Sequence, residues 1–526
     1  MVSTAPFVSL ADRIRAHASA TPDKPAVACD GRSLTYLLLV NQVEALAARI
    51  VASGLTPGGA RRVGILAANS LDVAVILASC QLLGVTAVPL PMLVTPDAQA
   101  RMIRDAQVTL LFCQADRVAN VKSDLDALDT GFDGRMIVLG DRGTDPEATL
   151  FQDWLRSDAG AFISPAIQPN WVSDLIYSSG TTGIPKGIAQ SYEGRAKQWI
   201  DLGGFGIDAG ARVLQTVSLS SNFGLSALLA AWWWGGCLFM MSKFSGEQAV
   251  EVLKREEISV AFLPPATLIR TMEAPGFEAG VKARECVKIC AGAPLSASQK
   301  QLVVDAWPGP FYEVYGQTET ASVTVLPVHA TAPDKLGSVG KPLPGVDIRI
   351  LDDEDHEMEV GEEGEIAVHS TTLMAGYHGQ KESDSSTHWR DEHGRRFVRT
   401  GDVGRLDDEG FLWLCDRKKD MIISGGYNVF PADIEKVLSD HPAVFEVAVI
   451  GFPSHKWGET PVAIVTLQRE ATANAEELRD WANARLGAIQ RLAAVRVVPE
   501  LPSGGMGKIL KRQLRAAFAD AIGMLP

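Results

Sequence analysis

The sequence predicts an α/β protein: a large N-terminal domain of βαβ-type sheets with a small β-rich subdomain, and a small α+β C-terminal domain. Three observations lead to this prediction. Up to about residue 335, short apolar segments alternate with segments of helical periodicity, which is typical of a parallel sheet covered on both faces. Short strands separated by Gly, Asp and Glu turns follow. The last roughly 110 residues carry a helix and strand pattern of their own, a normal size for a small domain.

The elements of the first region follow from their caps and apolar periodicity. Ser9 and Asp12 form a capping-box pattern that begins a helix to about His17. Helices are also expected from about residue 35 to 53 and at 71–83. Short apolar runs predict strands at 26–28, 63–66, 85–90, 110–112, 136–139, 213–217, 260–263 and 287–290.

The second half of the chain is less regular. Strands are expected at 346–351, 364–370 and 411–414, and the polar, acidic segment 376–396 is expected to be an exposed loop in which His388 and His393 are solvated. Beyond it we expect helices at 431–438 and 478–486 and strands at 444–450, 461–467 and 495–498. The charge cluster at 416–420 marks a joint, which gives a large domain (1–416), a hinge (417–419) and a small domain (420–526).

Composition excludes several classes of function. The formal net charge of −14 over 526 residues argues against nucleic acid or an anionic membrane as the main partner. Seven scattered cysteines without a CxxC pair read as small buried side chains in a reducing compartment, and Cys286 and Cys290 are spaced to share a helix face. The apolar run 225–241 contains Gly235-Gly236, which favours a buried helix, a turn and a strand over a membrane span. A cytoplasmic protein, monomeric or homodimeric, is expected.

A stretch at 177–187 carries the clearest chemistry. It reads Tyr-Ser-Ser-Gly-Thr-Thr-Gly-Ile-Pro-Lys-Gly and follows an apolar lead-in. Glycines let backbone N–H groups turn inward, hydroxyl groups add donors, and Lys186 adds a positive charge, a combination suited to a phosphate chain. It is not the common P-loop, because Lys186 is followed by Gly187 and not by Ser or Thr.

This stretch resembles the signature loop of the adenylate-forming (ANL) superfamily, which includes the acyl-CoA synthetases, and further blocks of that pattern occur in order. They are Gly292-Ala293-Pro294, Tyr315-Gly316-Gln317-Thr318-Glu319, Thr400-Gly401-Asp402, Arg417, and a Gly-rich tail that ends at Lys508. The resemblance implies an ATP/AMP-binding set of Ser178, Ser179, Gly180, Thr181, Thr182, Gly183, Lys186, Gly292, Ala293, Pro294, Tyr315, Gly316, Gln317, Asp402 and Arg417.

The resemblance also implies individual roles. Tyr315 stacks on adenine, Asp402 holds the ribose, Thr318 contacts phosphate, and Glu319 binds Mg²⁺, which prefers hard carboxylate oxygens. Lys508, with Glu319 and Thr318, makes up the expected catalytic set. Lys419 corresponds to the hinge residue, and the CoA-binding loop corresponds to Ser424, Gly425, Gly426 and Tyr427.

The acid-binding pocket departs from the family pattern. The family often has His where this chain has Tyr192 and Ser221, and the Trp before the TGD block is missing, with Phe397 nearby. The pocket is expected to comprise Ser220, Ser221, Asn222, Phe223, Gly292, Val314 and Ala321, with Gly316 and Trp199 close by. Small glycines leave room, and the polar run 220–222 offers hydrogen bonds but no charge. An aryl or medium-chain aliphatic acid is favoured.

The resemblance therefore implies an ATP-dependent carboxylic acid–CoA ligase that proceeds through an acyl-adenylate, with ATP, Mg²⁺ and coenzyme A as cofactors. Transfer of the acyl group to a carrier protein stays open as an alternative. An amino-acid-activating domain is disfavoured because the segment 220–222 has no Asp to pair with an ammonium group. A kinase would release ADP and not AMP, and a non-catalytic binding module is disfavoured because Glu319, Asp402, Arg417 and Lys508 are all present.

Overall fold

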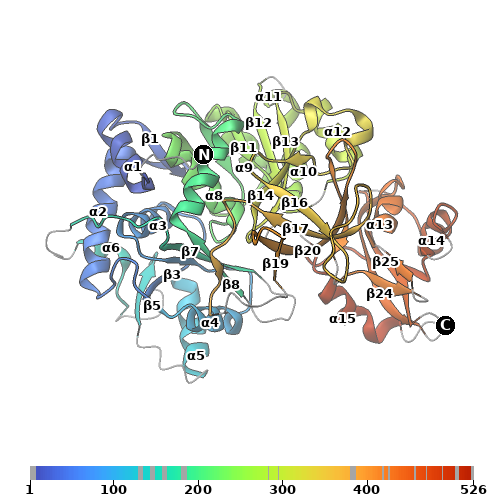
Figure 1. The fold of residues 1–526 in the computed structure, drawn as a ribbon. Coiled ribbons are helices and arrows are strands. Elements are labelled where there is room, and N and C mark those ends of the chain that lie inside the picture. Colours follow the sequence, from blue (N-terminus) through green and yellow to red (C-terminus); the bar gives the residue numbers. More distant parts are fainter. Residues whose placement is uncertain are drawn as a thin grey trace.

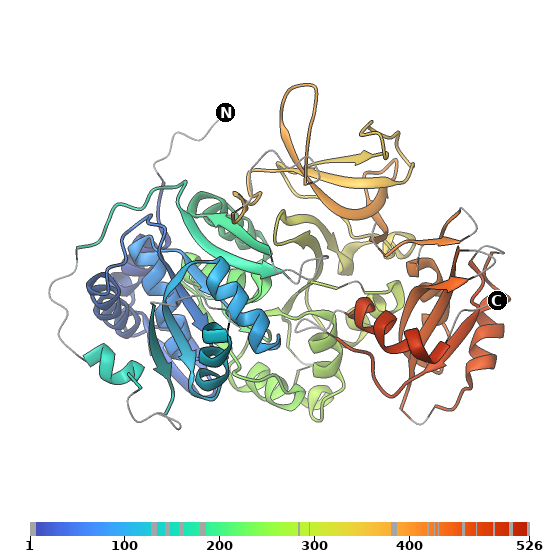
Figure 2. The same ribbon diagram turned by 90° about the horizontal axis from the view of Figure 1, so that it is seen from below.

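The structure is a computed structural model that describes residues 7–127, 134–141, 148–156, 163–178, 186–281, 284–293, 295–379, 387–417, 420–424, 427–429, 431–454, 458–469, 471–487, 490–503 and 509–522. Within these residues the strands form four sheets (Figure 1). Apart from strand β18, the two large sheets are built from residues that precede the two smaller sheets in sequence, and Figure 2 shows the fold from below.

The first large sheet has nine strands in the order β15-β14-β13-β12-β11-β9-β10-β1-β2. Its six central strands pair in parallel, which confirms the predicted βαβ pattern; they are β13 (Phe311–Gln317), β12 (Val287–Ala291), β11 (Val260–Phe262), β9 (Arg212–Gln215), β10 (Cys237–Met240) and β1 (Pro25–Cys29). Antiparallel strands complete both edges: β14 (Ala321–Pro327) and β15 (Lys341–Pro342) on one side and β2 (Arg32–Thr35) on the other.

The second large sheet has seven strands in the order β18-β8-β7-β4-β3-β5-β6. Its parallel strands are β7 (Val172–Ser178), β4 (Ala87–Pro89), β3 (Arg62–Leu66), β5 (Val108–Gln114) and β6 (Arg135–Leu139). Two antiparallel strands extend it, β8 (Lys186–Ser191) and β18 (Gly376–Tyr377). The connection from β7 to β8 is the predicted phosphate-binding stretch, of which residues 179–185 lie outside the described part of the chain.

One hydrophobic core joins the two large sheets through the helices between them. Its members come from both sheets and from α1 (Leu10–Ala20), α2 (Tyr36–Ala52), α3 (Leu71–Leu83), α7 (Tyr192–Leu202) and α8 (Asn222–Trp234). Helices α3 and α8 are apolar on all sides, and such a helix is stable only when it is buried on all sides. The run 225–241 is thus the predicted buried helix, glycine turn and strand, and among the described helices none is long and apolar enough to cross a membrane.

Local sequence signals fix several helix ends as expected. The Ser9 side chain accepts a hydrogen bond from the Asp12 N–H, which confirms the capping box of α1. Helix α3 ends at Gly84 in the left-handed region (φ +66°), where glycine has no steric penalty. The other helices of this region are α4 (Pro96–Asp105), α5 (Val118–Ala127), α6 (Phe151–Arg156), α9 (Gly246–Arg255), α10 (Pro265–Met272), α11 (Phe277–Gly280) and α12 (Ala297–Ala306).

The third sheet is the predicted β-rich part, made of β16 (Asp347–Leu351), β17 (Gly364–His369), β20 (Arg396–Leu406), β19 (His388–Arg390) and β21 (Leu412–Arg417). The expectation of one exposed loop at 376–396 was wrong at both ends. Residues 376–377 pair with β8 as strand β18, and residues 388–390 pair with β20 as β19. Backbone pairing, with a distant strand for β18 and in a local hairpin for β19, overrides the polar composition that predicted a loop.

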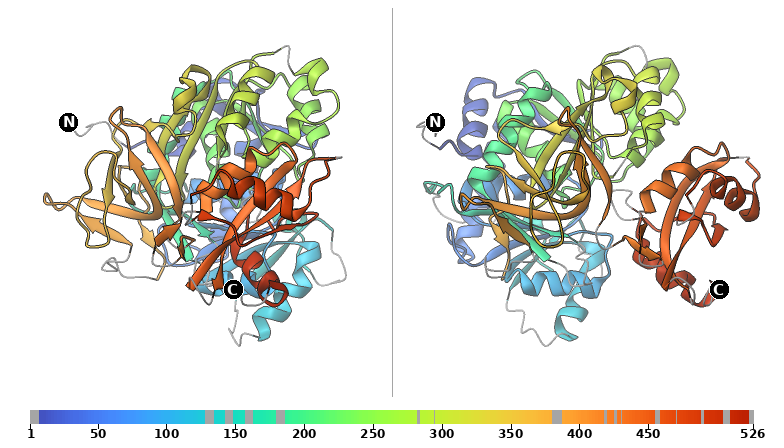
Figure 3. Two further views of the ribbon diagram at one scale, coloured as in Figure 1. Left: turned by 90° about the vertical axis from the view of Figure 1, so that its right-hand side faces the viewer. Right: turned by 45° about the vertical axis from the view of Figure 1, so that its right-hand side comes forward.

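The fourth sheet contains β23 (Tyr427–Val429), β22 (Ile422–Ser424), β25 (Gly458–Leu467), β24 (Val444–Ser454) and β26 (Ala494–Val497). Helices α13 (Pro431–Ser439), α14 (Ala475–Asn483) and α15 (Lys511–Ile522) accompany it. In the right-hand view of Figure 3 this segment forms a separate lobe beside the remainder of the chain. The predicted boundary at 416–420 overlaps the last two residues of β21 and ends before β22, and the proposed hinge residue Lys419 lies outside the described residues.

The cysteines follow one prediction and contradict another. All but one are buried and none is in a disulfide, as expected for small apolar side chains. Cys286 and Cys290, however, do not share a helix face, because residues 287–291 form strand β12, as the apolar run 287–290 predicted. Four-residue spacing alone does not separate the two structures in a short apolar run.

Candidate active site

Several predicted nucleotide residues lie together at the carboxyl ends of the parallel strands of the nine-stranded sheet. Ligands bind at this edge in open α/β sheets. Tyr315 and Gln317 lie at the end of β13. The Tyr315 hydroxyl donates to Asp402 Oδ2 at 2.8 Å, and Gln317 Nε2 donates to the same oxygen at 2.7 Å. Gln317 Nε2 also donates to the carbonyl of Thr400 at 2.9 Å. Residues from two predicted blocks, more than eighty positions apart in sequence, thus form one polar cluster.

Gly316 lies between these two side chains, where the hairpin from β13 to β14 turns tightly. A Cβ atom at Gly316 would lie 1.9 Å from the carbonyl oxygen of Ala321. Ala321 itself adopts φ +57°, in the left-handed region that few non-glycine residues enter. The hairpin therefore requires glycine at position 316 to keep Tyr315 and Gln317 in place.

The turn of this hairpin, which carries Thr318 and Glu319, is held from two sides. Gln190 of β8 donates through Nε2 to the carbonyl of Thr318 at 2.6 Å, and the Met374 N–H donates to the carbonyl of Glu319 at 2.8 Å. Both bonds use main-chain oxygens of the turn, so the side chains of Thr318 and Glu319 are left to act on a ligand or a neighbour.

Tyr377 connects Glu319 with the phosphate-loop lysine. Its hydroxyl donates to Glu319 Oε1 at 3.0 Å, and its ring centroid lies 5.1 Å from Lys186 Nζ, a cation–π arrangement. Burial, followed by the charge of Glu319, raises the pKa of Tyr377 above its ordinary value, so the phenol stays protonated and remains a donor. The sequence reasoning missed Tyr377 because it placed residues 376–396 in a loop; an aromatic residue in a polar segment was the available signal.

The remaining nucleotide positions are placed in part. Gly292 follows β12 with φ +98°, and Ala293 comes directly after it. Ser178 ends β7 opposite Lys186 at the start of β8, and Arg417 ends β21 opposite Asp402. Ser424 ends β22 and pairs with Tyr427. Ten predicted site residues lie outside the described part of the chain: Ser179, Gly180, Thr181, Thr182, Gly183, Pro294, Lys419, Gly425, Gly426 and, in the tail, Lys508. Of Ser178, Arg417 and Tyr427 only the backbone is described.

The polar run of the expected acid pocket lies at the start of α8. Ser221 caps this helix: its Oγ accepts from the Gly224 N–H at 3.1 Å and donates to the Ser218 carbonyl at 2.7 Å. Ser220 Oγ bonds to Ser218 Oγ at 2.8 Å. These hydroxyl groups are thus engaged within the loop. Gly224 is required there, since a Cβ atom would lie 2.4 Å from the Ser218 carbonyl oxygen.

Apolar members of the predicted pocket lie around this loop. Phe223 packs against Phe262 of β11 with ring centroids 5.2 Å apart, and Val314 is buried in β13. Two further positions considered from the sequence belong to the core instead. Trp199 packs against Trp233, and the Tyr192 hydroxyl donates to the carbonyl of Cys80 at 3.2 Å. Tyr192 therefore anchors α7 on α3.

The expectation that this region carries no charge was incomplete. Arg195 of α7 is fully buried and forms a two-pronged ion pair with Asp174 of β7. The guanidinium also donates to Asn222 Oδ1 at 2.5 Å. Sequence reasoning missed this pair because its members are distant in sequence and each lies in an otherwise ordinary strand or helix.

A magnesium ion at this site would have a single protein carboxylate. Glu319 is the predicted ligand, and in the described ranges no group of three or more His, Cys, Asp or Glu residues converges to hold a metal on its own. This donor set fits Mg²⁺, which is commonly bound by one or two carboxylates together with substrate phosphates and water.

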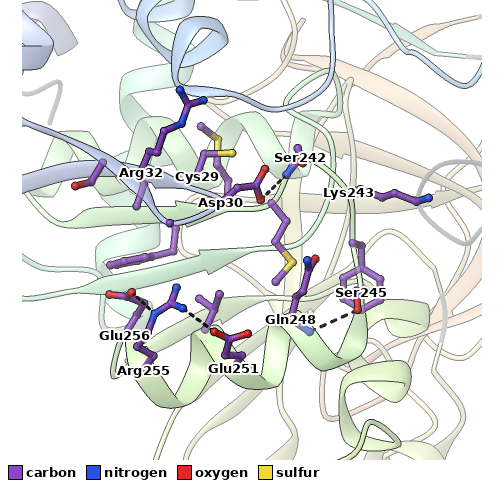
Figure 4. A pocket seen from close by; sticks show the side chains of 18 of the residues that line it. Cys29, Asp30, Arg32, Ser242, Lys243, Ser245, Gln248, Glu251, Arg255 and Glu256 are labelled. Atoms are coloured by element: carbon purple, nitrogen blue, oxygen red, sulfur yellow. Dashed lines mark hydrogen bonds and ion pairs between the residues drawn. The ribbon is translucent and has the colours of Figure 1, made fainter.

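A separate hollow of about 670 Å³ lies between the β1–β2 hairpin, the end of β10 and helix α9 (Figure 4). Its charged side chains pair largely with one another, as Arg212 does with Glu256 at 2.8 Å and Arg255 with Glu251 at 2.7 Å. None of the predicted site residues lines it. The candidate active site is therefore the carboxyl edge that carries Tyr315, and not this hollow.

Comparison with known proteins identifies the family of this chain. The AMP-binding enzyme family matches residues 14–378, and the AMP-binding enzyme C-terminal domain matches residues 433–508. The indoleacetate–CoA ligase of Aromatoleum aromaticum is 29% identical over 97% of this chain and 98% of its own length. A fatty acid–[acyl-carrier-protein] ligase of Streptomyces coeruleorubidus is 29% identical over 95% of both chains.

Among solved structures, the o-succinylbenzoate CoA synthetase of Bacillus subtilis with its acyl-adenylate intermediate superposes with a TM-score of 0.82 at 27% identity, covering 96% of this chain and 97% of that one. The fold predicted from the sequence is thus confirmed. Because the first family match alone spans well over half of the chain, this protein belongs to the AMP-binding enzymes and is an adenylate-forming enzyme of the acyl-CoA synthetase type.

Proposed function

We propose that this protein joins an aryl carboxylic acid to coenzyme A in two steps, with ATP converted to AMP and pyrophosphate. The observation that carries the proposal is the cluster at the end of β13. Tyr315 and Gln317 donate hydrogen bonds to Asp402 there. Tyr377 donates to Glu319, and the Tyr377 ring lies beside Lys186 Nζ. A medium-chain aliphatic acid is the second choice. The relatives whose names specify aryl acids support the first.

In the first step a carboxylate oxygen of the acid attacks the α-phosphorus of ATP. A new P–O bond forms, the bond to the pyrophosphate leaving group breaks, and the acyl-adenylate results. The protein contributes positioning and charge stabilisation, since phosphoryl-type transfer offers it little covalent chemistry. In this proposal Asp402 accepts from the ribose, the loop with Lys186 binds the β and γ phosphates, and Lys508 donates to both the carboxylate and the α-phosphate.

Mg²⁺ belongs to the proposal as a partner of the nucleotide. Glu319 would hold it together with phosphate oxygens, and the ion would neutralise negative charge on the phosphates. Tyr377 keeps the Glu319 carboxylate in one orientation through its hydroxyl hydrogen bond.

In the second step the CoA thiolate attacks the acyl carbon. A C–S bond forms, the C–O bond to the adenylate breaks, and AMP leaves. We assign the loop of Ser424, Gly425, Gly426 and Tyr427 to CoA, because a glycine pair leaves room for a narrow pantetheine arm. Lys419 is the proposed hinge for movement of the small domain between the steps, since hinges absorb a large backbone change in few residues.

A carrier protein in place of CoA is the second candidate acceptor. The observation that favours it is the relative that ligates fatty acids to acyl-carrier protein at the same identity as the CoA ligase. A cytoplasmic location and a monomer or homodimer stay predictions.

The testing experiment is acid-dependent ATP–pyrophosphate exchange over aryl, aliphatic, hydroxy and amino acids, followed by AMP release with CoA. We expect exchange with aryl acids and AMP release that depends on CoA. Exchange without a CoA response would transfer the proposal to the carrier protein, and exchange with amino acids alone would refute it. Lys508→Ala should abolish exchange while leaving ATP binding intact, and full exchange by that variant would remove Lys508 from the mechanism.

A further inference from the structure

A buried ion pair lies beneath the expected acid pocket. Arg195 of α7 and Asp174 of β7 are both fully buried, and Arg195 Nε donates to Asp174 Oδ2 at 3.0 Å while Nη2 donates to Oδ1 at 2.5 Å. This fork geometry matches the two oxygens of one carboxylate. The charge of Arg195 is therefore balanced inside the protein and offers little attraction to a charged ligand.

The third nitrogen of this guanidinium determines the orientation of Asn222. Arg195 Nη1 donates to Gln198 Oε1 at 3.0 Å and to Asn222 Oδ1 at 2.5 Å. A guanidinium can only donate, so the amide of Asn222 must present its oxygen to Arg195 and its Nδ2 to the other side. Asn222 is half-buried, and within the part of the chain that the structure describes its Nδ2 has no hydrogen-bond partner.

The position of Asn222 in the fold is at the edge of the sheet that carries the candidate site. It is the first residue of α8, directly after the loop that leaves the carboxyl end of β9, on the same edge of the sheet as Tyr315. The hydroxyl groups of Ser218, Ser220 and Ser221 bond within that loop. Among the polar side chains of the run, Asn222 thus offers two N–H donors to whatever occupies the pocket.

We propose that Asn222 is a specificity-determining residue that donates a hydrogen bond to a neutral acceptor on the acid, remote from its reacting carboxylate. The expected substrates are monocarboxylic acids with an ether, ketone or hydroxyl oxygen. A second carboxylate is disfavoured because Asp174 already balances Arg195. The inference rests on the proposed function, whose acid it narrows, and Arg195 and Asp174 act as positioning residues.

The substitution Asn222→Asp reverses the donor with almost no change in shape. One carboxylate oxygen replaces Oδ1 and keeps the contact with Arg195, and the other replaces Nδ2 and can only accept. A pocket that hydrogen-bonds a polar group of its substrate discriminates strongly against a ligand that cannot form that hydrogen bond. We expect the variant to lose about ten- to a hundred-fold in kcat/KM for acceptor-bearing acids, but little for their apolar analogues.

The matched control is Gln198→Glu. It makes the same amide-to-acid change on the same guanidinium, yet Gln198 is buried and its Nε2 faces the Thr372 carbonyl. An effect of added charge alone would appear in both variants, whereas an effect of direct contact with the acid would appear only at Asn222.

The probes are near-isosteric pairs in pyrophosphate exchange: 2-, 3- and 4-methoxybenzoate against the ethylbenzoates, and 6-oxoheptanoate against 6-methylheptanoate. We expect at least one pair with a kcat/KM ratio above about ten in the wild type, a ratio near one in Asn222→Asp, and the wild-type ratio in Gln198→Glu. A wild-type ratio near one for every pair, or an unchanged ratio in Asn222→Asp, would overturn the inference.

Failure of the CoA step leaves these ratios readable, because exchange reports adenylation alone. Should no acid support exchange, the proposed ligase activity is what has failed. Calorimetry of the same acids with the AMP-bound protein then gives the ratio of dissociation constants within each pair. A wild-type ratio near one for every pair, or an unchanged ratio in Asn222→Asp, would again overturn the inference.

Discussion

Removing the hydroxyl of Tyr377 tests whether the phenol orients the carboxylate that is proposed to bind Mg²⁺. Tyr377→Phe deletes the 3.0 Å hydrogen bond to Glu319 Oε1 and keeps the ring beside Lys186 Nζ. Hydrogen bonds to charged groups contribute about 1.5–3 kcal/mol. Because Glu319 is half-buried, water replaces part of the lost bond, so we take the lower end of this range.

A loss of about 1.4 kcal/mol in the transition state corresponds to about a tenfold lower kcat/KM. The assay is pyrophosphate exchange at several Mg²⁺ concentrations, and the variant should need more Mg²⁺ for half-maximal rate. Tyr377→Leu also removes the ring from Lys186 and should lose up to about a further thirtyfold, since cation–π contacts are worth about 0.5–2 kcal/mol.

The control is Tyr312→Phe. Tyr312 lies on β13, the strand that carries Tyr315, and packs against Phe205 and His329, and within the described residues its hydroxyl makes no hydrogen bond. The control should exchange like the wild type. A Tyr377→Phe enzyme within twofold of the wild type at every Mg²⁺ concentration would refute the reasoning, as would an equal loss in the control.

Three further predictions concern the scaffold. Gly316→Ala forces a Cβ atom against the Ala321 carbonyl, so it should lower the free energy of unfolding by about 1–3 kcal/mol and remove most of the ATP affinity. The control Gly204→Ala places its Cβ in open space and should change neither quantity. Equal urea midpoints for the two variants would contradict this prediction. Burial acts to raise the pKa of Asp407, but bonds from Lys335, an indole and a backbone N–H outweigh it and lower the pKa below 3.8. The charged Asp407 carboxylate therefore stabilises the folded protein above pH 3.8, and this stabilisation is lost as the pH falls further and the carboxylate is protonated. Asp407→Asn should lower the urea midpoint at pH 7, and its midpoint should approach that of the wild type in acid. Burial raises the pKa of six thiols to about 12, those of Cys29, Cys80, Cys113, Cys237, Cys286 and Cys415. At pH 8 Ellman's reagent should therefore react slowly with the native protein, and it should titrate all seven thiols after unfolding. A thiol that reacts fast in the native protein would count against this prediction.

Local signals were sufficient for much of the fold. The cap at Ser9, the apolar runs of α3 and α8 and the glycine turn before β10 each depend on neighbours within a few residues, and the structure has them as predicted. The α/β class follows from the same signals, because helical and extended periodicities differ along the chain itself. The motif at Tyr315–Glu319 was recognised from its resemblance to the family pattern, and the structure supplies the reason for its glycine, which the tight turn requires.

The sequence by itself therefore determined the family, the order of the elements and the candidate nucleotide residues. Only the tertiary structure decided which distant side chains meet. Tyr377 reaches Glu319 because two residues of a polar segment pair with β8, and Arg195 reaches Asp174 and Asn222 because α7 lies between β7 and α8. Strand pairing and helix packing between residues far apart in sequence produce no periodic pattern in the sequence. These contacts were therefore not predictable from the sequence alone.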